Sequence, residues 1–437
     1  MKNNSPSPLP ATEKPRPVSQ EDQTLVPHKT DWLGIGQFAF SALGAFLLLG
    51  ISLVSLLASL IQDSITPLGF QVGSDLSPYL FAFGLGGMGV LLIPSAFYAG
   101  RRLFTNQTSR QFQWIKLARI SYLAPALILL GFGIQNGPSW AKGFLPFIHV
   151  LANTAAVFWL LGIARRKLPD QSANRFWGTV ASGLGLTPLV TFILEILILI
   201  GIGLVWLVLM DLVPGIRQDL LDLATQFQNS SGDPGALQQA LGVFVARRGV
   251  LFTLFTYVAF LIPVVEEFLK PAAVWLLLRR KPSSWEGFVI GATSGAGYAL
   301  FENLTIGAAA DAWTFLTLTR IGTATVHIFT AGLMGWGLAS AFQEKKYLRM
   351  IGSYLGAVIL HGAWNGLNIL SAVAEFAAVQ TRIGPFVVGL AAWAPAGLVV
   401  LALGSFYGLL RTNKYFKRAI MAGSNKQSEA AWKLLIF

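Results

Sequence analysis

The sequence predicts an all-α, polytopic membrane protein with about ten transmembrane helices. Of its 437 residues, 54% are hydrophobic and only 12% are charged, and long apolar runs recur along the chain. A helix needs about 20 apolar residues to cross the hydrocarbon core of a bilayer, which is the length of these runs. A soluble chain of this size would interrupt them with far more charge, so the composition indicates a lipid bilayer as the surroundings.

The apolar runs and the basic residues between them predict both the spans and their direction. We expect spans at 33–61, 79–100, 120–137, 147–164, 187–210, 250–278, 288–310, 315–342, 351–376 and 385–410. Lys and Arg concentrate in both tails and in every second connection, at 101–119, 165–177, 279–287 and 343–350. The positive-inside rule assigns these segments, and therefore both termini, to the cytoplasm. The net charge of +12 is explained by this topology and by contact with anionic lipid, so no nucleic-acid partner is expected.

Four regions are expected along the chain. Residues 1–31 are rich in proline and polar residues, which predicts a disordered cytoplasmic tail. Residues 32–248 form five spans and end in an external loop at 211–249. Residues 250–376 form four further spans, and residues 377–437 hold the last transmembrane helix and a basic cytoplasmic tail. The chain has no cysteine, which excludes disulfides and thiolate chemistry.

The first five spans offer few polar residues. Glu195 is the one obvious acidic residue within them, and we interpret it as a hydrogen-bonding partner in helix packing. The external loop contains IRQDLLDLATQF, whose amphipathic pattern is typical of a helix lying on the membrane interface. His28 and His149 are expected to lie outside any functional site.

Five titratable side chains in four successive later spans carry most of the functional information. They are Glu266, Glu267, Glu302, His327 and His361. At 1.5 Å per residue, Glu267, Glu302, His327 and His361 lie about 15–23 Å from the cytoplasmic ends of their spans. Glu266 is adjacent to Glu267 and lies at nearly the same depth. Titratable groups cost several kcal/mol each in hydrocarbon, so a cluster at one depth indicates a functional site.

The spacing around the paired glutamates supports this interpretation. Glu266 and Lys270 are four residues apart, so they share a helix face, and the lysine can neutralise one of the two adjacent carboxylates. The other carboxylate can then serve as a base. Pro263 and Pro271 remove backbone N–H donors, which predicts a kink at the pair.

Further polar residues share helix faces with the titratable groups. Asn365 lies one turn after His361 and offers an amide donor beside a base. The remaining supporting candidates are Tyr298, Lys270, Glu302, Asn303 and Arg320.

Several familiar hydrolase motifs are missing from the sequence: HExxH of zinc proteases, GxGD of membrane aspartyl proteases and GxSG of rhomboid-like serine enzymes. Glu, His and Asn side chains can nevertheless activate water in two ways. A carboxylate with a histidine partner can act as a general base while His and Asn stabilise an oxyanion. Alternatively, two histidines and a carboxylate can hold Zn²⁺ with a water in its fourth position.

The ordered set EExxK at 266–270, FEN at 301–303, His327 and HxxxN at 361–365 resembles the PrsW family of intramembrane proteases. That family is related to the type II CAAX prenyl endopeptidases and the Abi bacteriocin-processing group. The resemblance, which covers 258–366, implies a PrsW-like catalytic core within 250–376.

The resemblance also implies roles for individual residues. Glu266 and Glu267 match the paired glutamates, and Glu266 corresponds to the base that activates water. His327 matches the histidine that shares this water, and His361 with Asn365 matches the pair that forms the oxyanion hole. Lys270 departs from the EExxxR of the prenyl endopeptidases, which favours the PrsW branch.

The sequence favours a metal-free glutamate mechanism over a zinc-dependent one, and no cofactor is expected. A zinc site would use His327, His361 and either Glu267 or Glu302. Against it stands Lys270, a competing cation beside the glutamates. No closely spaced histidine pair is present to seed a metal site either.

We therefore predict an intramembrane endopeptidase that hydrolyses membrane-associated protein substrates near the cytoplasmic half of the bilayer. The expected location is a cell membrane, and the resemblance implies a bacterial one. Two alternatives remain open: a proton-coupled transporter, because Glu, His and Lys chains also form proton relays, and a noncatalytic scaffold.

Overall fold

The protein is entirely built of helices in the part that the structure describes. The computed structural model describes residues 31–65, 76–105, 107, 109–209, 215–229, 234–306, 310–376, 379–380 and 385–421. Outside the helices, this part holds one isolated β-bridge, between Gln111 and Ser172. The all-helical prediction is confirmed. Residues 1–30, including His28, and residues 422–437 of the predicted tails lie outside the described residues.

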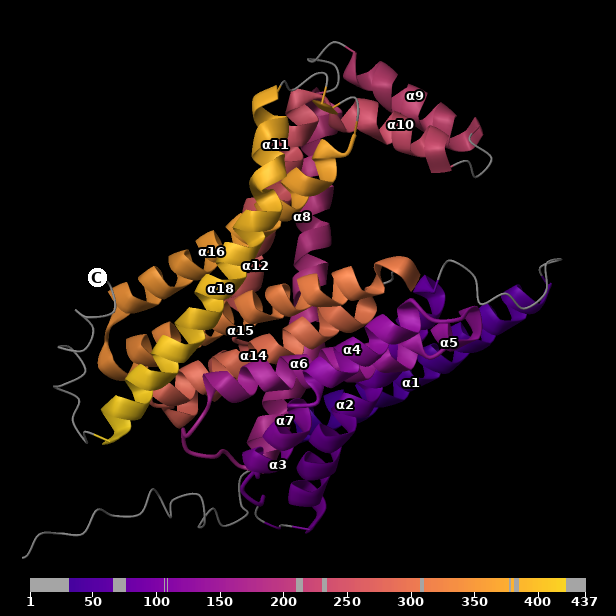
Figure 1. Ribbon diagram of the computed structural model, residues 1–437. Coiled ribbons are helices and arrows are strands. Elements are labelled where there is room, and N and C mark those ends of the chain that lie inside the picture. The colour runs from indigo at the N-terminus through magenta and orange to yellow at the C-terminus, as the bar shows by residue number, and fades with distance from the viewer. Residues whose placement is uncertain are drawn as a thin grey trace, which may run out of the picture.

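The N-terminal region contains eight helices. Their bounds are α1 Trp32–Ile65, α2 Ser77–Thr105, α3 Trp114–Ser121, α4 Ala124–Gln135, α5 Ser139–Lys142, α6 Leu145–Ala164, α7 Ala173–Ala181 and α8 Thr187–Leu209. A π-helical turn, Ser182–Leu186, joins α7 to α8 without a break in the chain direction. In Figure 1, α8 runs from the packed helices to the pair α9 and α10, which project from the rest of the molecule.

The remaining helices complete the fold. Their bounds are α9 Ile216–Asn229, α10 Pro234–Val245, α11 Arg248–Thr256, α12 Ile262–Leu269, α13 Ala272–Leu277, α14 Ser284–Thr305, α15 Trp313–Glu344, α16 Tyr347–Ala374 and α18 Pro385–Met421. Helix α9 coincides with the predicted amphipathic segment, so its helical structure is confirmed. Its placement on the membrane interface stays a prediction, as does the cytoplasmic location of both termini.

Nine helices of the described part are long and apolar enough to cross a membrane. They account for nine of the ten expected spans. The tenth, expected at 288–310, corresponds to α14, which is helical but less apolar because it is rich in Gly, Ala, Ser and Thr. Almost all of α14 from Gly287 to Leu300 is buried by neighbouring helices, so its side chains need not be compatible with lipid.

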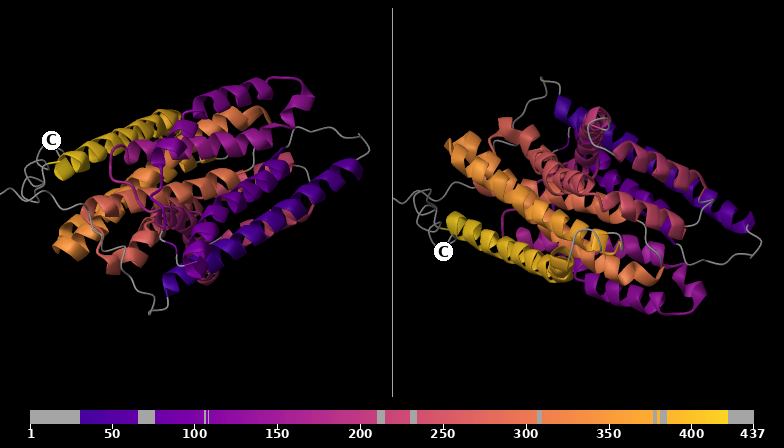
Figure 2. Two further views of the ribbon diagram at one scale, coloured as in Figure 1. Left: turned by 90° about the horizontal axis from the view of Figure 1, so that it is seen from below. Right: turned by 90° about the horizontal axis from the view of Figure 1, so that it is seen from above.

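Small residues bring α14 and α15 into close contact at the centre of the bundle. A Cβ atom added at Gly291 would lie 2.2 Å from the carbonyl oxygen of Ala331, and one at Gly295 would lie 2.5 Å from that of His327. Such approaches require glycine, and they let helices pack through van der Waals contact where lipid provides no hydrophobic drive. In both views of Figure 2 the long helices around this pair run side by side.

The chain is irregular just before and just after the paired glutamates. A π-helical turn at Tyr257–Leu261 precedes α12, and α12 ends at Leu269, before Pro271. Proline lacks the N–H that would continue the helix, so α13 starts anew at Ala272. The α-helix is thus interrupted on both sides of the pair where a kink was predicted, and π-helical turns are frequent at functional sites.

Candidate active site

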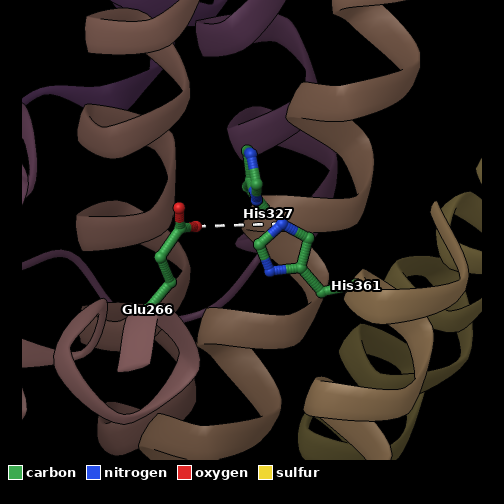
Figure 3. A group of neighbouring side chains, drawn as sticks. All are labelled: Glu266, His327 and His361. Atoms are coloured by element: carbon green, nitrogen blue, oxygen red, sulfur yellow. Dashed lines mark ion pairs between the residues drawn. The ribbon is translucent and has the colours of Figure 1, made fainter. Parts of the chain in front are cut away.

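Three helices deliver one titratable side chain each to a common point. Glu266 comes from α12, His327 from α15 and His361 from α16, and Figure 3 shows the three side chains pointing toward one another. Each offers a ligand atom, and these atoms all lie within 4.8 Å of one another. All three residues are buried. The structure thus brings together residues that lie up to 95 positions apart in the sequence.

The ammonium group of Lys270 lies among these side chains. Its Nζ is 2.8 Å from Glu266 Oε2, 2.7 Å from Glu267 Oε1 and 2.8 Å from His327 Nδ1. His361 Nδ1 also lies near, 3.3 Å from Lys270 Nζ. Lys270 itself is fully buried. Three acceptor atoms, two from α12 and one from α15, therefore surround a single buried positive charge.

Local geometry explains how Lys270 reaches this position. It pairs with Glu266 at i,i+4 and with Glu267 at i,i+3, so one helical turn carries both ion pairs. The backbone carbonyl of Lys270 accepts a hydrogen bond from Ser294 Oγ on α14, at 2.5 Å. This bond provides a partner for a carbonyl next to the break at Pro271.

Carboxylates fix the orientation of both imidazole rings. His361 Nδ1 lies 2.9 Å from Glu267 Oε1, and His327 Nε2 lies 3.0 Å from Glu302 Oε2. A carboxylate that accepts one ring N–H leaves the other ring nitrogen with a free lone pair. The nitrogens that keep a lone pair are then Nε2 of His361, 3.8 Å from Glu266 Oε2, and Nδ1 of His327, which Lys270 Nζ contacts at 2.8 Å.

Glu302 is held in turn by a group of polar residues. Arg320 Nη2 forms an ion pair with Glu302 Oε2 at 2.5 Å, and Arg320 Nε donates to Asn303 Oδ1 at 2.9 Å. His149 Nε2 lies 2.9 Å from the Asn303 carbonyl oxygen. His149, expected to be unconnected to the site, thus touches the backbone of a residue that binds Arg320. Its helix, α6, packs against α14 and α15, a contact that sequence spacing does not reveal.

The two remaining candidates lie at the edge of the cluster. The Tyr298 ring is 4.8 Å from Lys270 Nζ and packs edge-on against His327, with ring centroids 5.5 Å apart. Asn365 Nδ2 donates to the carbonyl oxygen of Val258, at 3.0 Å, in the π-helical turn. Its oxyanion-binding role stays a prediction, because one of its amide hydrogens is engaged with the backbone.

Glu195 belongs to the cluster although the sequence indicated only a packing role. Its carboxyl group on α8 is close enough to interact electrostatically with Glu266, and its backbone carbonyl oxygen accepts a hydrogen bond from the Tyr257 hydroxyl group at 3.1 Å. A sequence signal for this existed: Thr187, Thr191 and Glu195 follow one another at four-residue intervals, so they form a polar stripe on an otherwise apolar helix. The stripe lies outside 258–366, the range of the resemblance, and a single sequence does not show which helix covers it.

The residues present suit a divalent metal ion. The donor set of two imidazoles and a carboxylate is the one that zinc hydrolases use, with a position left for water. In addition, Glu267 Oε2 and Glu195 Oε1 are buried and accept no hydrogen bond from any residue in the described ranges. Buried carboxylate oxygens without donors are costly, and a nearby cation relieves that cost.

Fold and site together define a class. This is a multi-pass helical membrane protein with a buried His/Glu site of hydrolytic type between its helices. Comparison with protein families narrows the class further: residues 234–395, more than a third of the chain, match the PrsW family intramembrane metalloprotease model. The chain carries an intramembrane protease domain of this family. No curated protein and no solved structure matched the chain.

The family assignment decides between the interpretations left open by the sequence. The predicted resemblance to PrsW is confirmed, and the matched range is wider than the predicted 258–366. An enzyme is favoured over a transporter or a scaffold. The metalloprotease description and the Glu266, His327, His361 group support the zinc-dependent alternative over the metal-free mechanism that the sequence favoured. Glu266, rather than Glu267 or Glu302, lies in this group.

Proposed function

We propose that the protein is a zinc-dependent endopeptidase that hydrolyses peptide bonds of membrane-protein substrates within the bilayer. Residues 250–376 would form its catalytic core, with Glu266, His327 and His361 as the metal-binding residues. The convergence of these three buried side chains from three helices is the observation that carries the proposal. A multi-pass chain with an intramembrane metalloprotease domain supports a substrate that is itself a membrane protein.

The metal would supply Lewis-acid chemistry, polarising the scissile carbonyl and making a water molecule acidic enough to attack it near neutral pH. The protein's own part begins with holding the ligands. Glu267 and Glu302 accept the outer N–H groups of His361 and His327, so each imidazole presents its free nitrogen toward Glu266 and Lys270. Such carboxylate partners typically improve metal affinity about 10- to 100-fold.

Glu267 is the proposed proton acceptor. Its Oε1 is engaged with Lys270 and His361, whereas Oε2 is buried and has no donor in the part of the chain that the structure describes. A carboxylate oxygen free of donors next to the metal-binding group can take a proton from attacking water and deliver it to the leaving amine. Lys270, in contact with both glutamates, would offset the charge that changes during this transfer.

The test uses purified full-length protein in lipid vesicles, with a library of quenched-fluorescence peptides that contain an apolar span. Wild-type protein is expected to bind one zinc ion and to cleave part of the library. Treatment with a strong chelator should abolish cleavage, and added zinc should restore it. Glu266→Gln should lose both zinc and cleavage, whereas Glu267→Gln should keep zinc and lose cleavage, because an amide oxygen still accepts the His361 N–H.

Two results would contradict the proposal. One is cleavage that persists after chelator treatment, in protein shown to hold no metal. This result would support the metal-free glutamate mechanism instead. Proton flux across the vesicle membrane without cleavage of any peptide would favour the transporter alternative instead.

A further inference from the structure

The π-helical turn Tyr257–Leu261 leaves one backbone carbonyl without a donor from its own helix. The N–H of Ile262 donates to the carbonyl oxygen of Tyr257, five residues back, instead of to that of Val258. The next residue that could donate to Val258 is Pro263, which has no N–H. Within a bilayer no bulk water replaces the missing donor, so this carbonyl needs a partner from another helix.

Asn365 supplies this partner from α16. Its Nδ2 donates to the Val258 carbonyl oxygen at 3.0 Å. The two helices come this close because Gly362, three residues earlier, has no side chain: a Cβ atom there would lie 2.3 Å from the carbonyl oxygen of Ala259. Gly362 follows His361 directly, so the segment from His361 to Asn365 packs on the π-helical turn.

The π-helical turn decides the direction in which Glu266 points. Such a turn holds one residue more than an α-helical turn, and each residue of an α-helix rotates the chain by about 100°. If Ile262 donated to Val258 in the α-helical way, the residues after the turn would face about 100° away from their present direction. Glu266 would then project away from His361, whose Nε2 now lies 3.8 Å from Glu266 Oε2.

The Asn365 amide favours the π-helical arrangement over the α-helical one. In the α-helical arrangement the Val258 carbonyl receives its hydrogen bond from Ile262 and needs no other donor. In the π-helical arrangement that bond is lost, and the hydrogen bond from Asn365 replaces it. Removing the amide therefore removes the interaction that compensates for the irregular turn.

A second hydrogen bond joins α16 to α12 nearer to the site. The hydroxyl group of Tyr354 donates to the carbonyl oxygen of Val264, two residues before Glu266, at 2.8 Å. Helix α16, which carries His361, is thus bound at two points to the backbone that leads to Glu266.

We propose that Asn365 is a positioning residue: its amide holds the π-helical turn and thereby directs Glu266 toward His361. This role differs from the oxyanion-binding role that the family resemblance implied. The inference rests on the proposed function in one respect, because it takes Glu266 and His361 as metal-binding residues. The geometry of the turn itself does not depend on a metal.

The first measurement is zinc affinity in full-length protein, with zinc buffered by a competing chelator in detergent. Asn365→Leu keeps nearly the shape of the side chain without its donor, and should weaken zinc binding about 10- to 100-fold, the range typical of groups that orient metal ligands. Asn365→Gln retains an amide and should lie between this variant and wild type. Asn368→Leu is the matched control and should bind zinc as wild type does, because Asn368 Nδ2 donates to the Trp364 carbonyl oxygen of its own helix, at 2.8 Å.

The second measurement reports the direction of α12 in metal-free protein. The chain has no cysteine, so spin labels attach only to introduced ones. Labels replace the exposed residues Phe268 on α12 and Phe97 on α2. Asn365→Leu should shift their distance by up to about 8 Å, the displacement at the surface of a helix about 11 Å wide that rotates by about 100°. Labels at Phe97 and at exposed Phe315 on α15 are the control pair, whose distance should stay the same.

The outcomes separate this inference from the proposed function. An unchanged label distance in Asn365→Leu would overturn the inference, whether or not zinc binding weakens. Lower cleavage with unchanged zinc affinity and label distance would assign Asn365 to the oxyanion instead. An equal loss of zinc affinity in Asn368→Leu would also overturn the inference. Wild type that binds no zinc would overturn the proposed function, whereas a shifted label distance in Asn365→Leu would still support the positioning role.

Discussion

The spans that contain α8 and α15 have opposite surroundings. The span formed by α7 and α8 is the most apolar of the nine candidates, and only 6% of its most apolar window is buried inside the protein. The α15 span is the least apolar, and 83% of the corresponding window is buried. Lipid selects apolar side chains on exposed helices, whereas a helix surrounded by protein can carry small and polar residues. Low hydropathy within a span therefore marks a helix enclosed by protein rather than the site as such, since α12 carries Glu266 in a span of which only 11% of the most apolar window is buried.

Helix α14 continues this trend. It falls short of the apolar character expected of a span, yet most of its residues are fully buried and it packs against α15 over its whole length. Glu302 and Asn303 near its end help to orient His327. Glu195 is the converse case. Helix α8 is mostly exposed and apolar, and the polar stripe that includes Glu195 marks the face of α8 that packs toward the site.

The largest effect is expected from a substitution on the buried helix. His327→Ala removes a proposed metal-binding imidazole and should reduce cleavage by at least about 100-fold, the contribution typical of a group engaged at the reacting centre. Leu318→Ala is the control on the same helix, because Leu318 is exposed and nine residues away. The measurement is the initial rate of cleavage in vesicles. Full activity of folded His327→Ala would contradict this prediction, because it would show that the buried face of α15 contributes no more to cleavage than the exposed face.

The contrast in packing predicts the next largest effect. Gly291→Val would force a side chain against the Ala331 carbonyl of α15 and should destabilise the protein by about 1–3 kcal/mol or more. Gly201→Val on α8 is the matched control, because a Cβ atom there meets nothing within 4 Å. Thermal unfolding in detergent compares the two. Equal melting temperatures would mean that α14 and α15 can separate without cost.

The network behind His327 should have a smaller effect. Arg320→Met leaves Glu302 without its partner, so the carboxylate is expected to orient His327 less well and zinc affinity should fall about tenfold. The double variant Arg320→Met with Glu302→Gln removes the unpaired charge and should recover part of the lost stability. Chelator competition measures the affinity. A zinc affinity unchanged in Arg320→Met would show that Glu302 orients His327 without help.

Much of this architecture was predictable from sequence, and the exceptions have physical causes. Apolar length identified the spans, and titratable residues at one depth identified Glu266, His327 and His361. The position of Lys270 among their acceptor atoms was not predictable. The histidines around its ammonium group come from two other helices, and spacing alone suggested a cation that would repel zinc.

Long-range packing explains the residues that spacing did not connect. His149 and Glu195 lie near the cluster because α6 and α8 pack against helices far along the chain, with His149 bonded to the Asn303 backbone and the Glu195 backbone bonded to Tyr257. A single sequence gives the face on which a residue lies, but not the helix that covers this face. Helices of the region 32–248 therefore pack directly on helices of the region 250–376 that carry the candidate site.

The smallest effect should come from the contact that links these regions at the far end of α14. Arg175 on α7 pairs with Glu286 at 3.3 Å, and both side chains are partly exposed, at 23% and 27%. Glu286 also completes a capping box with Ser283, which remains when Arg175 is removed. Arg175→Ala should therefore cost less than about 1 kcal/mol, and the difference should vanish in about 1 M salt, which shortens the range of charge interactions. Thermal unfolding at two salt concentrations measures it. A larger, salt-independent loss, or weaker zinc binding, would mean that the α7 contact helps to position α14 and the site that it supports.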